Sequence, residues 1–494
     1  MSARDVILAV DQGTTGTTCL LLDASMRLIA KHTHDFTQHF PEPGHVEHDP
    51  TEIWESVCRA IAEVLAKSAI ATSRIAAIGV TNQRETSVVW RRSDGRAIHR
   101  AIVWQDRRTA GVCEGLRARG FADQVRTMTG LVLDPYFSGT KFAWILDHVD
   151  GARSAAERGE LVAGTIDTYL LWRLTGGRAH KTEPSNASRT MLWPLLGGGW
   201  SDELCELLRV PRSILPEVHP CTAEFGHTLG VPGLPDGIPI HGIAGDQQAA
   251  LFGQACFGPA QAKCTYGTGA FMVLNTGERI VPSSHGLLTS VAWQIGEQTT
   301  WCLEGSCFMA GAVVQWLRDG LGIIASAAEV EALAASVPDS GGVVLVPAHA
   351  GLGAPHWRPA ARGLIRGITR GTTKAHLARA ALEGIALQIA DLARAMAADL
   401  GKPLGLLRVD GGAAANDLLM QLQADLLEAP LDRPRMLEAT GLGAAALAGL
   451  GVGLWRDMDE LGAHWQRDRR FEPNLDSPAR DELRARWSEA IACA

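Results

Sequence analysis

One local pattern occurs twice in this chain of 494 residues, and it constrains the fold more than any other feature. Residues 8–23 read LAVDQGTTGTTCLLLD, and residues 260–275 read AQAKCTYGTGAFMVLN. Each segment has two apolar runs that predict strands, joined by a turn rich in glycine and threonine. The copies lie about 250 residues apart, which is typical of a weak internal repeat. We therefore expect two similar halves whose hairpins face one another across a cleft.

A third glycine-rich turn follows another apolar strand, in residues 406–417 (LLRVDGGAAAND), and leads directly into an expected helix. Glycines at such turns let the backbone approach a ligand closely, and successive N–H groups can hold a phosphate. The structural alternative for each turn is simply a tight reversal of the chain. The chain lacks the P-loop pattern and a G-x-G-x-x-G after a strand. The three turns are similar to the two phosphate turns and the adenosine turn of the actin and hexokinase superfamily.

Segments with helical and strand periodicity alternate throughout the chain, which predicts an α/β fold. Residues 52–68 and 375–400 have helical spacing, and residues 75–90 are typical of a strand, a loop and a second strand. A chain of this length exceeds one ordinary core, so we expect two large domains or three smaller ones. The repeat begins again just after residues 254–260, which divides the chain into residues 1–254 and 255–494.

Composition and charge exclude several classes of protein. The net charge is −8 and no block of Lys and Arg occurs, which argues against nucleic-acid binding. The ten cysteines form neither a C-x-x-C pair nor a cluster at zinc spacing, as expected of reduced thiols in the cytoplasm. The N-terminus does not resemble a signal peptide, and the uncharged stretch at residues 439–455 is shorter than the ~20 residues of a membrane span. We expect a cytoplasmic protein without a membrane span.

Ten segments are spread in register over nearly the whole chain: DQGTTG (11–16), GHVEHDP (44–50), TNQRET (81–86), AIVWQDRR (101–108), DPYFSGTKFAWILDH (134–148), NASRTML (186–192), GIAGDQQAALFGQ (242–254), TYGTGAFM (265–272), FMAGA (308–312) and RVDGGAAAN (408–416). Together they resemble the FGGY carbohydrate kinases. The resemblance implies two actin-like (ribonuclease H-like) α/β domains that face a central nucleotide cleft. It implies the ATP-dependent phosphorylation of a polyol, with glycerol as the expected substrate and sn-glycerol 3-phosphate as the product.

Asp246 follows the apolar run IPIHGIAG, where a carboxylate at the end of a strand would be fixed and exposed to a cleft. By resemblance it is the base that takes the proton of the attacking hydroxyl, although an aspartate there can also cap a helix. Arg84 and Glu85 are adjacent, so on a regular strand they would point to opposite faces. Only a loop at the strand end lets both reach one ligand; the alternative is a surface loop with an ion pair.

The resemblance extends to the walls of both substrate sites. An apolar wall with few polar groups is usual for a small-molecule site, but large aromatic side chains are also commonly buried in cores. The further residues implied to contact the polyol are Trp104, Tyr136, Gln247 and Phe271. Those implied to contact the nucleotide are Thr14, Thr15, Thr268, Gly311, Gln315, Gly412 and Asn416, whose glycines can equally serve as turn residues.

Asp11 is implied to hold Mg²⁺ through water, because Mg²⁺ keeps most of its hydration shell. The chain departs from the family at Gly16 and Thr18, where a hydroxyl side chain and an arginine usually stand, so one cation is missing beside the phosphates. The implied partners are glycerol and ATP, and a homo-oligomer (dimer or tetramer) is possible.

Two other functions remain open from the sequence. One is an FGGY kinase that acts on a pentulose or a tetritol, and the other is a non-catalytic ATPase with the actin fold. The segments QRET and GDQQ together with Tyr136 favour glycerol.

Overall fold

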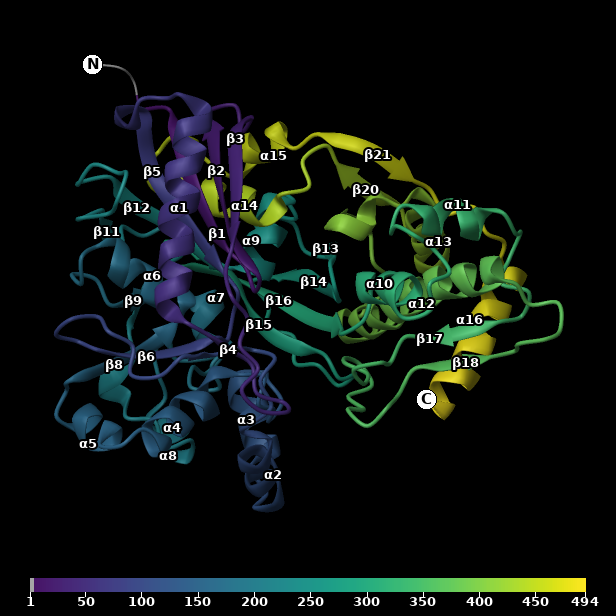
Figure 1. The fold of residues 1–494 in the computed structure, drawn as a ribbon, viewed down its shortest axis with the longest axis horizontal. Helices are drawn as coiled ribbons and strands as arrows, with labels where there is room; N and C mark the ends of the chain where they lie inside the picture. The colour runs from purple at the N-terminus through teal and green to yellow at the C-terminus, as the bar shows by residue number, and fades with distance from the viewer. Residues whose placement is uncertain (1–3) are drawn as a thin grey trace.

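The computed structural model describes residues 4–494, which form two α/β domains beside one another (Figure 1). The first domain is built on a six-stranded sheet. The second is built on a seven-stranded sheet. The strands of the first sheet, in spatial order, are β11 (Gly226–His227), β12 (Pro239–Gly245), β5 (Ile75–Asn82), β1 (Val6–Gln12), β2 (Gly16–Asp23) and β3 (Leu28–Asp35). Those of the second are β15 (Leu288–Ile295), β16 (Gln298–Cys307), β14 (Ala270–Gly277), β13 (Gln261–Tyr266), β19 (Leu406–Asp410), β20 (Leu431–Pro434) and β21 (Arg467–Phe471).

The two sheets share one topology around the repeated hairpin. β1 pairs antiparallel with β2 and parallel with β5, and β13 pairs antiparallel with β14 and parallel with β19. In each sheet a further strand, β3 or β16, continues antiparallel beyond the hairpin. The predicted internal repeat and the two-domain α/β fold are therefore confirmed.

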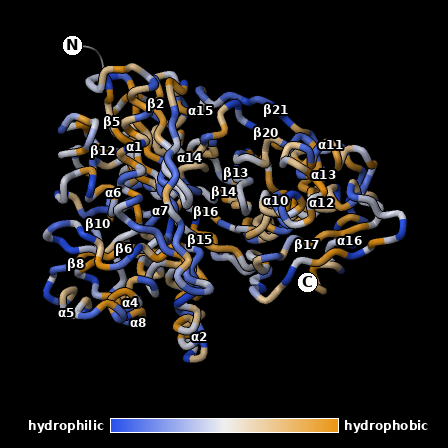
Figure 2. The backbone as a smooth tube through the Cα atoms, viewed as in Figure 1, coloured by the Kyte–Doolittle hydropathy of each residue, from blue (hydrophilic) through white to orange (hydrophobic). Residues whose placement is uncertain are grey.

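Two amphipathic helices lie close to where periodicity predicts them. α1 (Pro50–Ser68) packs on β2 and β3, and its N-terminus is capped by Asp49, which accepts a hydrogen bond from the N–H of Thr51 at 2.8 Å. α12 (Lys374–Leu400) packs against α13 (Asp417–Leu427) in the core of the second domain. Apolar residues concentrate in the interior of both domains and polar residues lie on the loops (Figure 2).

A smaller, four-stranded sheet is attached to the first domain. Its order is β4 (Glu47–His48), β7 (Ala101–Ile102), β6 (Ser87–Arg91) and β8 (Leu161–Thr165). The helices of this region are α2 (Ala110–Ala118), α3 (Ala122–Thr129), α4 (Ser138–His148), α5 (Ala152–Glu157), α6 (Ile166–Leu174), α7 (Pro184–Ala187) and α8 (Asp202–Leu207). The other elements are β9 (Lys181–Thr182), β10 (Glu217–Val218), α9 (Asp246–Gly253), α10 (Gly311–Asp319), α11 (Glu329–Ala335), β17 (Val344–Val346), β18 (Leu364–Arg366), α14 (Ala439–Gly451), α15 (Met458–His464) and α16 (Ser477–Cys493).

Helix α14 returns from the second half of the chain to the first sheet, where it packs on α9, β12, β5 and β1. Glycines make this close approach possible. A Cβ atom added to Gly443 would lie 1.8 Å from the carbonyl oxygen of Ala249, and one added to Gly253 would lie 2.1 Å from that of Ala439. The division of the chain at residue 254 falls at the C-terminal end of α9 and stays a prediction.

No helix within residues 4–494 combines the length and the apolarity that crossing a membrane requires. The stretch at residues 439–455 instead supplies α14, whose residues 441–449 are all buried.

We expect Gly443→Ala to lower the free energy of unfolding by about 3 kcal/mol, the upper part of the usual range for overpacking, because the new methyl group meets rigid backbone. Chemical unfolding monitored by circular dichroism measures this. Gly115→Ala is the matched control, since nothing lies within 4 Å of a Cβ atom at this exposed position of α2. Equal stability of the two variants would contradict the assigned contact between α14 and α9.

Candidate active site

The loop between β5 and β6 brings Arg84 and Glu85 to the same side of the chain. Glu85 adopts a φ of 59°, in the left-handed region that few non-glycine residues occupy. Its carboxylate oxygen Oε1 consequently lies 3.8 Å from Nε of Arg84, and both side chains are buried. The predicted loop is confirmed, and the alternative of an exposed surface loop is wrong.

Two buried guanidinium groups enclose one carboxylate from the second domain. Nη1 of Arg84 donates to Oε2 of Glu304 at 2.6 Å, and Nη1 of Arg189 lies 3.3 Å from Oε1 of Glu304. Nε of Arg189 donates to Oε1 of Glu85 at 2.6 Å. Burial opposes the charged form of Glu304, but Arg189 and Arg84 outweigh burial and lower the pKa of Glu304 to about 2.

Asp246 is the first residue of α9, directly after the end of β12. Its Oδ1 accepts a hydrogen bond from the backbone N–H of Gln247 at 2.7 Å and lies 3.2 Å from Nε of Arg84. Nε2 of Gln247 donates to Oδ2 of Asp246 at 3.1 Å, while the buried ammonium of Lys263 donates to Oε1 of Gln247. The Asp246 side chain is 30% exposed, so the carboxylate is held by the protein yet remains open to a ligand.

Three aromatic rings form a wall beside these polar groups. The ring of Trp104 meets those of Tyr136 and Phe271 edge to face, with centroids 5.7 and 6.1 Å apart. A cavity of about 10 Å³ lies among Arg84, Tyr136, Phe271 and Glu304. The structure therefore gathers the residues that the sequence assigns to the polyol at one place.

Backbone contacts from a buried lysine fix two parts of this wall. Nζ of Lys141 donates to the carbonyl oxygen of Tyr136 at 2.6 Å and to that of Glu85 at 3.3 Å. Burial lowers the pKa of Lys141 to about 7. Lys141 thus positions the left-handed residue and the aromatic wall from a single helix, α4.

The residues assigned to the nucleotide lie on the three turns and the helices that follow them. Thr14 is on the β1–β2 turn, and its hydroxyl accepts a hydrogen bond from Nε1 of Trp104 at 3.0 Å, so it links the two proposed substrate sites. Thr268 is on the β13–β14 turn, where its carbonyl oxygen accepts from the N–H groups of residues 310 and 312. The carbonyl oxygen of Thr15, on the same turn as Thr14, accepts a hydrogen bond from the N–H of Phe36.

The third turn and α10 complete this group. Open space lies in front of Gly412, since a Cβ atom there would meet nothing within 4 Å, whereas one on Gly311 would lie 2.7 Å from the carbonyl oxygen of Gly267. Gln315 is exposed on α10. Asn416 caps α13 by accepting from the N–H of Leu419 at 2.8 Å, so its Oδ1 already has a structural role.

Asp11 stands near the end of β1, half-buried. Burial and the neighbouring Asp246 raise the pKa of Asp11 to about 7. The ionised carboxylate of Asp11 is therefore not balanced by nearby positive charge, and this environment fits a site for a cation. Among residues 4–494 no group of three or more His, Cys, Asp or Glu side chains could hold a metal ion. The single carboxylate of Asp11 fits Mg²⁺, because Mg²⁺ binds through one or two carboxylates and completes its coordination shell with water.

Arg189 and Glu304 are among the residues of the site that received no role from the sequence. Arg189 lies within the segment NASRTML, but nothing local distinguishes it from a surface arginine. Glu304 is the single charged residue in the apolar strand sequence TWCLEGSC, and a lone charge in a buried strand is a usable signal of a paired group. Its partners come from residues 84 and 189, which the sequence alone does not place beside it.

Comparison with known proteins agrees with this geometry. Residues 6–253 match the N-terminal domain of the FGGY family of carbohydrate kinases, and residues 262–452 match its C-terminal domain. The chain belongs to the FGGY family of carbohydrate kinases.

Within this family the chain is similar to proteins named glycerol kinase. It is 56% identical to that of Myxococcus xanthus, over 99% of both chains. It is 58% identical to that of Trichlorobacter lovleyi, over 98% of both chains. The crystal structure of Plasmodium falciparum glycerol kinase with ADP has a TM-score of 0.93 at 34% identity, over 99% of this chain and 98% of that one. A xylulose kinase structure from Lactobacillus acidophilus, at 24% identity and a TM-score of 0.87, shares the fold.

We expect Glu304→Gln to be destabilised at neutral pH by about 3 kcal/mol, since it removes the one carboxylate that pairs with both buried guanidinium groups. The pKa of Glu304 in the folded protein is about 2, below its usual 4.5. Its charge therefore stabilises fully above pH 4.5, and this stabilisation is lost as the pH falls towards 2. The stability gap between wild type and variant should narrow from about pH 7 to about pH 3.

Urea unfolding across this pH range measures the gap. Glu278→Gln removes the same charge from an exposed position at the end of the neighbouring strand β14, and should show no such gap. A gap for Glu304→Gln that stays constant with pH would contradict the assigned ion pairs.

Proposed function

We propose that the protein transfers the γ-phosphoryl group of ATP to a terminal hydroxyl of glycerol, giving sn-glycerol 3-phosphate and ADP. The observation that carries this proposal is the Asp246 carboxylate, held 3.2 Å from Arg84 at the N-terminus of α9 and still partly exposed. Relatives with more than half of their residues identical to this chain are named glycerol kinase, which supports glycerol as the acceptor.

In this reaction Asp246 accepts the proton of the attacking hydroxyl. Phosphoryl transfer requires the nucleophile to be positioned and its proton removed while charge on the phosphates is balanced. The backbone N–H and side-chain amide of Gln247 and the guanidinium of Arg84 hold the carboxylate in one orientation. Lys263 in turn holds Gln247, so the orientation of the base depends on a chain of buried contacts.

Glycerol is bound between polar groups and an aromatic wall. Nε and Nη1 of Arg84 are engaged by protein carboxylates and by Gln248. Nη2 of Arg84 donates no hydrogen bond within residues 4–494, so in this proposal it serves a glycerol hydroxyl. Trp104, Tyr136 and Phe271 exclude water from the carbon chain, and exclusion of water prevents hydrolysis of ATP in place of transfer. Glu85 and Gln247 supply the remaining hydroxyl contacts in this proposal.

ATP lies across the three turns in this proposal, with Thr14, Thr15 and Thr268 at the phosphates. Gly311, Gln315, Gly412 and Asn416 surround the ribose and adenine; the open space at Gly412 supports this, whereas Oδ1 of Asn416 already caps α13. Asp11 would hold Mg²⁺ through water, and the bound ion would balance charge on the phosphates.

The non-catalytic alternative has less support. A protein that only binds or hydrolyses ATP has no need of a buried Arg84–Glu304–Arg189 network beside an aromatic wall. We also propose a cytoplasmic location, which fits cysteines that are all free, and a division into domains at residue 254. A coupled assay of ADP release with and without glycerol tests the function: release that ignores glycerol, or that responds only to a pentulose or tetritol, would overturn it.

We expect Asp246→Asn to bind glycerol and ATP but to lower kcat by at least about 10²-fold, because the amide keeps the shape yet is a far weaker base. Steady-state kinetics and calorimetric titration with glycerol measure the two effects. Asp236→Asn, in the exposed turn before β12, removes an equal charge and serves as the control. Near-normal turnover of Asp246→Asn would remove this residue from the role of base.

We expect Tyr136→Phe to raise KM for glycerol with little change in KM for ATP, since loss of one buried hydrogen bond costs about 1–3 kcal/mol. Tyr169→Phe is the matched control, because the hydroxyl of the buried Tyr169 accepts a hydrogen bond from Arg173, within the core of the first domain. If KM for ATP rose instead, the assignment of the polyol wall would be wrong.

A further inference from the structure

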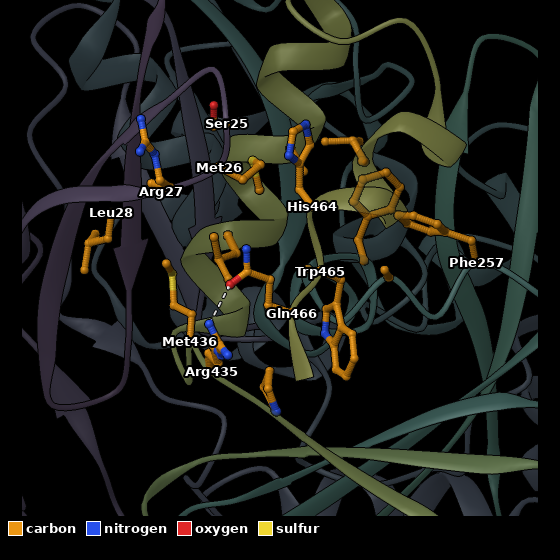
Figure 3. A pocket seen from close by; sticks show the side chains of 17 residues that line it. Ser25, Met26, Arg27, Leu28, Phe257, Arg435, Met436, His464, Trp465 and Gln466 are labelled. Carbon is orange, nitrogen blue, oxygen red and sulfur yellow. Dashed lines mark hydrogen bonds between the residues drawn. The ribbon is translucent and has the colours of Figure 1, made fainter. Parts of the chain in front are cut away.

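A second cavity, of about 330 Å³, lies away from the active site at the junction of the two domains (Figure 3). None of the residues that line it belongs to the proposed glycerol or nucleotide site. We call it the junction cavity. Its size falls within the range of small-molecule sites.

Three segments that connect the domains line the junction cavity. The first leads from α9 to β13 and contributes Ala255 and Phe257. The second leads from β20 to α14 and contributes Arg435 and Met436. The third leads from α15 to β21 and contributes residues 464–466. The β2–β3 turn of the first domain, residues 25–28, completes the wall. A molecule in the cavity would therefore touch every one of these connections at once.

The lining has an apolar body and a positively charged rim. Met26, Phe257, Met436 and Trp465 are half-buried in the wall, over the buried Phe252. The charged groups are two arginines, and no aspartate or glutamate occurs among the lining residues, although the protein carries a net charge of −8. Such a site suits a small molecule that has an apolar body and one acidic group.

Of the two arginines, Arg435 is the one free to bind an acid. The guanidinium of Arg27 already pairs with Asp23 at 2.9 Å. In the described part of the chain, the side chain of Arg435 makes one long hydrogen bond, 3.4 Å from Nη1 to Oε1 of Gln466, and has no carboxylate partner. Figure 3 shows the Arg435 side chain beside Met436 and Gln466 at the edge of the cavity.

A line of hydrogen bonds leads from the cavity towards the cleft. Nε1 of Trp465 donates to Oε1 of Gln254 at 3.1 Å, and Nε2 of Gln254 donates to Oδ2 of Asp410 at 2.7 Å. Asp410 ends β19 immediately before the third glycine-rich turn. The guanidinium of Arg408 lies 4.0 Å from the centre of the Trp465 ring and holds the indole in place. A ligand that displaces the Trp465 indole can thus affect the turn assigned to adenosine through Gln254 and Asp410.

We propose that the junction cavity is a second ligand site, for a small molecule with an apolar body and one acidic group, and that its occupancy is coupled to nucleotide binding in the cleft. The coupling rests on the proposed nucleotide site, whereas binding in the cavity does not. A ligand that spans the three connections binds one relative arrangement of the domains better than another, and this difference is the source of the coupling.

The probe is 8-anilino-1-naphthalenesulfonate, whose fluorescence rises in apolar sites, titrated into the full-length protein. We expect saturable binding of one molecule per chain. N-phenyl-1-naphthylamine has the same ring system without the sulfonate and is the matched neutral probe. Arg435→Met should weaken binding of the sulfonate about tenfold, the loss of one charge-assisted hydrogen bond, and leave the neutral probe nearly unchanged.

Two further variants complete the test. Met436→Trp fills the cavity and should weaken both probes. Arg456→Met removes one charge from an 83% exposed side chain that does not line the cavity, and should affect neither. All variants should keep the wild-type thermal midpoint, which excludes probe binding to an unfolded fraction. Equal affinity of the sulfonate for all four proteins would overturn the site.

The coupling between the junction cavity and the nucleotide site is measured by titrating the sulfonate at rising concentrations of ADP with Mg²⁺. We expect the apparent Kd to shift by about fivefold and then level off, with an equal shift in the Kd of ADP when the probe is present. A Kd that rises without limit would place the probe in the cleft and overturn the proposal. Unchanged affinity for both ligands would overturn the coupling, while failure of the kinase function alone would leave sulfonate binding intact.

Discussion

Glu304 stands on a strand of the second sheet, yet both guanidinium groups around it belong to the first domain. Three buried charges are costly in a low-dielectric interior unless each is paired and hydrogen-bonded. Arg84 meets this requirement only when β16 lies against the β5–β6 loop, and Arg189 only when the chain after α7 lies there too. The ion network therefore links the two domains beside the residues assigned to the polyol.

The geometry of the active site depends on this ion network. Arg84 contacts Glu304 on one side and Asp246 on the other, so the guanidinium that holds the domains together also orients the proposed base. The left-handed backbone conformation of Glu85 directs the carboxylate of this residue towards Arg189. A strained backbone conformation of this kind is kept only where the surrounding structure holds it, and such positions are concentrated at functional sites.

A second constraint acts where α14 returns to the first sheet and packs on α9. Glycine is required at residue 443 because two helix backbones meet there with no space for a side chain. The same return of the chain creates the connections that line the junction cavity. Close contact at the helices and open space at the connections are two consequences of one topology, in which the chain passes between the domains more than once.

Local sequence determined much of this protein. The Gly/Thr hairpins at residues 8–23 and 260–275, the helices at residues 50–68 and 374–400, and the loop that carries Arg84 follow from periodicity and from turn-forming residues, which act over a few positions along the chain. The partners of Arg84 did not follow, because Glu304 is 220 residues away and only the packing of the two sheets brings them together. The sequence also did not predict that α14 packs on the first sheet, since its small apolar residues are compatible with any close helix contact. What the tertiary structure alone decided is which buried charges meet, because pairing in the interior depends on distances in space that no local pattern encodes.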